Sequence, residues 1–202
     1  MKKAIILMIF LSMITLSISG QTSHIDSKTS DEIKRHVQEK VSQLTDYISL
    51  MADKRYTSQD RYYTKKQALN LFVAKGESYE IDGNIRKGVI METTSLYRKN
   101  PLKRLMKDYF DGVINYKYST VEISKNKWYE IKVSDLILVD NNLYKCTACF
   151  EQTFEGRLDG RTVYKDKTKK DVEVFIEIEE TMDGYDYIIK LGDVTAKETR
   201  RY

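Results

Sequence analysis

The chain has 202 residues and a formal net charge of +4, and 32% of its residues are charged. Apolar residues make up 41% and recur at regular spacings, which excludes a disordered chain and indicates one globular domain of ordinary size. The nearly balanced charge argues against a protein that binds nucleic acid through its overall field.

The first twenty residues are typical of a bacterial secretory signal peptide. Lys2 and Lys3 give a positive start, residues 4–18 are almost entirely apolar, and residues 17–20 supply a small-residue exit. The apolar run is shorter than the roughly 20 residues that span a bilayer, and a retained membrane anchor is the alternative. We therefore expect residues 1–20 to be cleaved and the protein to be secreted or periplasmic. Membrane contact is expected only if this segment is retained.

Residues 30–53 carry the clearest helical pattern in the chain. Thr29 and Glu32 form a capping box, and six apolar residues then follow at spacings of three and four. They are Ile33, Val37, Val41, Leu44, Ile48 and Met51. His36 lies off this stripe, so we expect it to be a lone, exposed histidine.

A second helix is expected from Thr57 or Ser58 to a stop at Gly76. Its first half, residues 54–66, interleaves Lys and Arg with tyrosines, a composition that can bind nucleic acid by pairing phosphates and stacking bases. The segment is short, is diluted by acidic residues, and belongs to a chain that we expect to be exported. We therefore predict a solvated helix face and no nucleic-acid partner.

A hairpin and a third helix are expected next. Residues 78–81 and 88–92 have the pattern of paired strands around a turn at residues 82–84. Asn100 is then expected to be the N-cap of a helix whose first residue is Pro101. Its predicted buried stripe comprises Leu102, Leu105, Met106, Tyr109, Phe110 and Val113.

The last part of the chain has the alternating pattern of strands. Strands are expected near residues 121–123, 131–139 and 143–154, and a charged loop is expected over residues 155–171. A terminal hairpin then turns at residues 183–184. The positions of this hairpin that we expect to face inward are Val172, Val174, Ile176, Ile178, Tyr185, Tyr187, Ile189 and Leu191.

The two cysteines form a C-x-x-C pair, Cys146 and Cys149, which invites a redox or metal interpretation. Their flanks are aromatic and β-branched, so the pair is expected inside a strand, where residues three apart point to opposite faces. Zinc would need two further ligands, and His24 and His36 are distant in sequence. We therefore interpret both cysteines as structural thiols and expect no bound metal.

Helices gathered early and strands gathered late indicate one α+β domain over residues 29–202, after a polar leader at residues 21–28. The N-terminal helices would pack on a curved antiparallel sheet. This element order resembles the cystatin-like, nuclear-transport-factor-two-like superfamily, in which the sheet wraps the first helix into a cone. The resemblance covers residues 30 to about 196 and rests on the long first helix, the Pro101 helix and the terminal hairpin, with no sequence motif.

The resemblance implies one of two kinds of function. In enzyme members, the cone holds a pocket in which an aspartate or histidine acts as general base beside tyrosine hydroxyls. In binding members, the sheet face or the mouth of the cone takes a protein or a small ligand. The fold alone does not choose between these functions.

The residues favour binding over catalysis. The inward-facing positions named above contain no ionisable group other than tyrosine, and the best candidates among the other acids, Asp135 and Asp186, are expected in solvent. We therefore expect no catalytic residue and no cofactor. The predicted function is an exported binding or accessory domain, with an envelope or extracellular protein or a small apolar ligand as partner, and a homodimer is left open. The alternative is a small-molecule pocket enzyme of the same fold, of the proton-transfer or lyase type.

Six aromatic residues are the candidate ligand or partner face, because tyrosine and tryptophan combine a large contact area with one polar group. They are Trp128, Tyr129, Tyr144, Phe150, Tyr185 and Tyr187. Strands also favour aromatic residues, so packing in the core or between strands is the alternative for this set.

Overall fold

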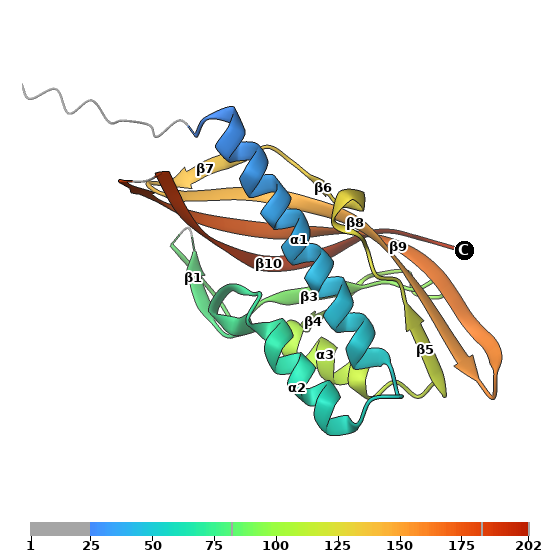
Figure 1. Cartoon of the computed structure of the whole chain (residues 1–202). Helices are drawn as coiled ribbons and strands as arrows, with labels where there is room; N and C mark the ends of the chain where they lie inside the picture. The colour runs from blue at the N-terminus through green and yellow to red at the C-terminus, as the bar shows by residue number, and fades with distance from the viewer. Residues whose placement is uncertain (1–24, 82, 183, 202) are drawn as a thin grey trace, which may run out of the picture.

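The computed structural model describes residues 25–81, 83–182 and 184–201. The predicted signal peptide and the first half of the polar leader, residues 21–24, lie outside these residues, as do single positions of two predicted turns, Asp82 and Asp183. Within the described ranges, three α-helices pack against one side of a strongly curved sheet (Figure 1). In these ranges no helix combines the length and the apolar character needed to cross a bilayer.

Helix α1, Ser27–Ala52, runs across the sheet and forms the centre of the core (Figure 1). The six residues of its predicted stripe are all fully buried, which confirms the helix and its inward face. Its start differs from the prediction, because Asp26 is the N-cap and its carboxylate accepts a hydrogen bond from the Thr29 backbone N–H at 3.0 Å. Thr29 instead donates its hydroxyl proton to the same carboxylate, so the cap lies three residues earlier than expected.

Helix α2, Ser58–Leu69, begins at the predicted cap, where Thr57 and Asp60 form a capping box. It ends earlier than the predicted stop at Gly76, and a short 3₁₀ turn, η1, covers Val73–Gly76. The reason is tertiary, because the backbone after the helix meets the sheet: the Leu191 N–H donates to the Leu71 carbonyl at 2.9 Å.

The third helix, α3 at Met106–Ile114, also starts later than predicted. The expected cap at Asn100 and first turn at Pro101 are wrong, because the next four residues form strand β4, Leu102–Leu105. This strand pairs with β3, Ile90–Thr93, and the Met106 N–H donates to the Val89 carbonyl at 2.7 Å. Strand pairing therefore outweighs the local helix signal at Pro101.

The main sheet has the strand order β4-β3-β10-β9-β8-β5, and β6 and β7 also pair with β8. All its pairs are antiparallel except β3 with β10. Strands β5, β6 and β7 span Thr120–Ile123, Lys132–Val133 and Ile137–Asp140, and the long strands β8, β9 and β10 span Leu143–Leu158, Arg161–Thr181 and Gly184–Arg200.

The first predicted hairpin is only partly correct. Strand β1, Tyr79–Ile81, pairs with β2, Asn84–Arg86, in a separate two-stranded sheet. The expected partner, residues 88–92, instead contributes β3 to the main sheet.

The largest correction concerns residues 155–171, which were expected to be a loop. They are the outer halves of β8 and β9, joined by a two-residue turn at Asp159 and Gly160 with φ values of +50° and +77°. Positive φ at both positions is the geometry of a tight hairpin turn that matches the twist of its strands. The pairing of β8 with β9 continues to this turn with one register shift, after Gly156.

The α+β class and the curved, largely antiparallel sheet packed on N-terminal helices are thus confirmed. The even-numbered residues of β9 face the helices along most of the strand. From Val172 to Ile178 they are apolar and belong to the core, whereas from Tyr164 to Lys170 they are polar. One end of the concave face is therefore filled with side chains, and the other end is lined with functional groups.

Candidate functional site: a polar pocket in the concave face

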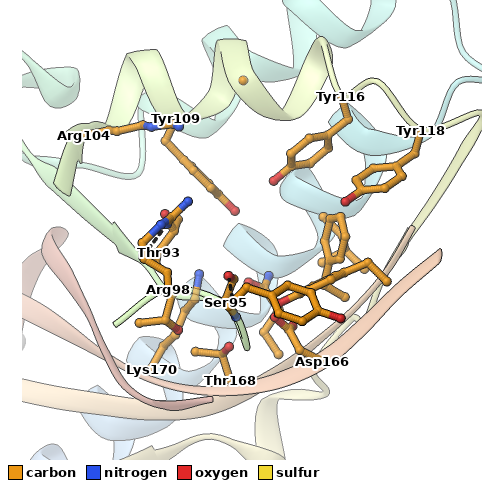
Figure 2. A pocket seen from close by; sticks show the side chains of 17 residues that line it. Thr93, Ser95, Arg98, Arg104, Tyr109, Tyr116, Tyr118, Asp166, Thr168 and Lys170 are labelled. Atoms are coloured by element: carbon orange, nitrogen blue, oxygen red, sulfur yellow. Dashed lines mark hydrogen bonds between the residues drawn. The ribbon is translucent and has the colours of Figure 1, made fainter. Parts of the chain in front are cut away.

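A cavity of about 350 Å³ lies at the polar end of the concave face, between α3 and the outer parts of β8 and β9 (Figure 2). The segment between β3 and β4 contributes a third wall. The lining residues are Thr93, Thr94, Ser95, Tyr97, Arg98, Arg104, Tyr109, Gly112, Tyr116, Tyr118, Ile123, Gln152, Phe154, Tyr164, Asp166, Thr168 and Lys170.

Strand β9 supplies the most unusual wall of the pocket. Alternation along a strand places Tyr164, Asp166, Thr168 and Lys170 on one face. Asp166 is only 5% exposed to solvent and Lys170 only 4%, although charged residues are rarely buried so completely. The concave face therefore carries two buried charged side chains, whereas the inward-facing positions predicted from the sequence contain no ionisable group other than tyrosine.

The Lys170 ammonium contacts a sulfur atom and an aromatic ring. Its Nζ lies 3.6 Å from the Met91 sulfur and 5.6 Å from the centre of the Tyr109 ring. None of the described residues places a carboxylate within 4.0 Å of it. Burial lowers the pKa of Lys170 to about 8, and the charge of Asp166 only partly opposes this effect.

Asp166 is paired with a neighbour on its own strand. Its carboxylate accepts a short hydrogen bond from the Tyr164 hydroxyl, which in turn accepts a hydrogen bond from the Leu96 backbone N–H at 3.1 Å. Burial raises the pKa of Asp166, although the Tyr164 hydrogen bond and the charge of Lys170 oppose this. Burial, together with that same hydrogen bond, raises the pKa of Tyr164 to about 12.

Three tyrosines form the opposite wall, and their hydroxyls point into the pocket (Figure 2). Burial raises the pKa of Tyr116 to about 12 and that of Tyr109 well above its ordinary value, so both stay protonated and can donate. Tyr116 and Tyr118 pack edge-on against Phe154, with ring centres 5.3 and 5.7 Å apart. Among the described residues, no side chain or backbone group forms a hydrogen bond with the hydroxyls of Tyr109, Tyr116 or Tyr118.

Several hydrogen-bond donors that line the pocket form no hydrogen bond with a described residue. The buried Gln152 lacks a partner for its amide Nε2 within the described structure. Arg98 and Arg104, both exposed to solvent, line the same cavity. With Lys170, the site carries three cationic side chains against the single carboxylate of Asp166. Such an arrangement favours a ligand that is rich in acceptors and negatively charged.

The six predicted aromatic residues lie elsewhere. Tyr144 and Phe150 are buried in the core on the inward face of β8, and Tyr185 and Tyr187 are partly buried against that core. Trp128 and Tyr129 are 46% and 59% exposed on a 3₁₀ turn, η2, at Trp128–Glu130. The structure therefore does not bring the six together on one exposed face, and none of them lines the cavity.

His36 is not the isolated, exposed residue that the sequence predicted. It is partly buried, and its Nδ1 lies 2.6 Å from the Tyr187 hydroxyl. Of the two acids considered from the sequence, Asp135 is 96% exposed and ion-paired with Lys34, and Asp186 is exposed. Neither acid lines the pocket.

The two cysteines lie on β8 in a stretch of regular pairing, so they point to opposite faces as predicted. Both are free thiols. Burial raises the pKa of Cys146 to about 12, and burial and the neighbouring Asp171 raise that of Cys149. Within the described ranges, no group of three or more His, Cys, Asp or Glu side chains is arranged to hold a metal ion.

Asp166 and Lys170 were not predicted as site residues, because the charged segment that contains them has the composition of a loop. Two features of the sequence indicate that these residues lie on a strand and face inward. The dipeptide Asp159-Gly160 is a strong hairpin signal, and the inward phase of Val172 to Ile178, continued towards that turn, reaches Lys170 and Asp166.

Comparison with protein-family models and with curated protein sequences finds no match. Among solved structures, the chain is similar to a scytalone dehydratase-like protein from Novosphingobium aromaticivorans DSM 12444, with 8% identity, a TM-score of 0.43, and coverage of 87% of this chain and 91% of that chain. It is also similar to the Kfla4162 protein from Kribbella flavida, with 11% identity, a TM-score of 0.40, and coverage of 87% and 95%. Because these values carry no assignment of activity, we infer the function from the residues of the pocket.

Proposed function

We propose that the protein binds a small organic anion in the polar pocket of the concave face, outside the cytoplasm. The observation that supports this most directly is the buried Lys170 ammonium, which has no carboxylate partner in a cavity already lined by Arg98 and Arg104. A buried charge is costly unless it is paired, and a carboxylate group on a ligand supplies the missing partner.

The uncharged donors support the same proposal. The Gln152 amide and the hydroxyls of Tyr109, Tyr116 and Tyr118 are available to the oxygen atoms of a ligand. The cavity volume of about 350 Å³ is at the small end of the range for ligand sites, which suits a compact acid. The proposed ligand is therefore polar, in contrast to the small apolar ligand predicted from the sequence.

Calorimetry with matched ligands tests the proposal. We expect small carboxylates, such as 4-hydroxybenzoate and its aliphatic counterparts, to bind more tightly than the corresponding neutral amides. Lys170→Met should weaken carboxylate binding at least tenfold, because it removes the buried charge. Lys169→Met is the control, since Lys169 is adjacent and exposed on the opposite face of β9. Equal binding of acids and amides across the panel, or unchanged binding by Lys170→Met, would overturn the proposal.

A second candidate function is proton transfer on the bound molecule, and the pairing of Asp166 with Tyr164 favours it. A buried carboxylate with a raised pKa is a suitable general base, and the protonated Tyr109 and Tyr116 are suitable donors to a developing oxyanion. Deuterium exchange at carbons next to a carbonyl group, followed by NMR in D₂O, measures this activity. Asp166→Asn should abolish exchange, whereas Asp186→Asn, which changes an exposed acid outside the pocket, should leave it intact.

A further inference from the structure

We propose that the Lys170 amine reacts reversibly with the carbonyl carbon of a small oxo acid in the polar pocket of the concave face and forms an imine. This inference rests on the proposed function and deepens it by naming the ligand class, a compound with both a carbonyl group and a carboxylate. A simple acid pairs its only charged group with Lys170, whereas the carboxylate of an oxo acid is held by the exposed Arg98 and Arg104 and leaves Lys170 to meet the carbonyl group.

The surroundings of Lys170 leave its amine available for bond formation. An ion pair with a carboxylate would stabilise the ammonium form and occupy its donors, but the described residues provide none within 4.0 Å. Nζ contacts the soft sulfur of Met91 at 3.6 Å and lies over the ring of Tyr109. Neither group competes strongly for the nitrogen lone pair once the proton is lost.

Burial also makes the neutral amine accessible. With a pKa of about 8, roughly one Lys170 in ten is uncharged at pH 7 and roughly nine in ten at pH 9. An exposed lysine with an ordinary pKa is almost entirely protonated in this range. Desolvation of this kind is one of the recognised ways to activate a lysine as a nucleophile towards carbonyl compounds.

The reaction needs only water and proton carriers. The amine lone pair forms a C–N bond to the carbonyl carbon, the C=O π electrons move to oxygen, and a proton moves from nitrogen to oxygen to give a carbinolamine. Protonation of that hydroxyl by solvent, relayed through the Asp166 carboxylate, lets water leave as the nitrogen lone pair forms C=N. Addition of water reverses the sequence, so no oxidant or reductant is consumed. Asp166 lines the same cavity and has a raised pKa, which suits this proton transfer.

Reductive trapping tests the inference on the full domain. Glyoxylate is the oxo-acid probe, and glycolaldehyde is the uncharged aldehyde of similar size; cyanoborohydride converts any imine to a stable secondary amine. Intact mass and peptide mapping should show one adduct at Lys170, formed at least tenfold faster with glyoxylate than with glycolaldehyde. The rate should rise between pH 7 and 9.

The variants separate a specific reaction from background labelling. Lys169→Met should form the adduct as fast as the wild type, whereas Lys170→Met and Lys170→Arg should lose the fast adduct. The arginine variant keeps the positive charge but not the amine. Circular dichroism checks that each variant is folded. Labelling spread over surface lysines and unchanged in both Lys170 variants would overturn the inference. Carboxylate binding without a Lys170 adduct would refute imine formation alone, whereas a Lys170 adduct formed equally fast with both probes would refute the preference for an anion.

Discussion

Replacing Lys170 with methionine should stabilise the protein at neutral pH. Burial holds the pKa of Lys170 at about 8, from an ordinary value of 10.5. Below pH 8, Lys170 is protonated in both the folded and the unfolded protein, so the folded state carries the full cost of the buried charge. Between pH 8 and 10.5, the unfolded chain binds more protons than the folded protein, so the free energy of unfolding rises with pH until this cost has disappeared. The difference between the pKa of Lys170 in the unfolded and in the folded protein corresponds to about 3 kcal/mol, because a tenfold change in an equilibrium constant is worth about 1.4 kcal/mol.

Methionine has a similar length and no charge, so Lys170→Met should raise the free energy of unfolding by about 3 kcal/mol at pH 7 and by much less above pH 10. Urea unfolding followed by circular dichroism measures this difference, provided that the denaturant slope is unchanged. Lys169→Met, on the exposed face, should change stability by less than about 0.5 kcal/mol at either pH. A variant that is less stable at pH 7, or equally stabilised at both pH values, would refute the reasoning.

Three further predictions concern the pocket wall, the thiols and export. Gly156→Ala places a Cβ 2.8 Å from atoms of the Tyr118 ring, so we expect the ring to move, carboxylate binding to weaken and the melting temperature to fall; unchanged binding and melting would contradict this. A thiol reagent should label Cys146 only after unfolding, because the thiol is buried and its pKa is about 12, and fast labelling in the native protein would show the opposite. If residues 1–20 are a cleaved signal peptide, the intact mass of exported protein should lack them, whereas the full-length mass would favour the retained anchor.

The helical part of the fold was largely predictable, because burial of one helix face imposes a period that the sequence displays. Helix α1 shows this at each of its six stripe positions. Its cap was missed by three residues because Asp26 and Thr29 are both good N-cap residues, and the choice depends on local geometry. At Pro101 the local signal was misleading, since strand pairing between β3 and β4 is a long-range contact that no local pattern reports.

The site was not predicted, for a reason that follows from the shape of the sheet. Alternation between polar and apolar residues reveals a strand only where one face is buried in an apolar core. In the outer half of β9, one face meets solvent and the other meets a polar pocket, so both faces are polar. Asp166 and Lys170 therefore have the sequence appearance of a charged loop, although they occupy the same inward phase as Val172.

The position of Lys170 itself argues for a ligand. Val172 and Val174 continue its face of β9 into the core, so an apolar side chain at position 170 would extend that core and avoid the cost of a buried charge. The lysine instead lies beside Met91 and over the ring of Tyr109, and the cation–π attraction to that ring is smaller than the cost of burying an unpaired charge. A residue that weakens the fold, in a cavity with unpaired donors at Gln152, is better explained by a bound partner than by folding. Loss of carboxylate binding together with a gain in stability in Lys170→Met is the combination that a binding role predicts and a purely structural role does not.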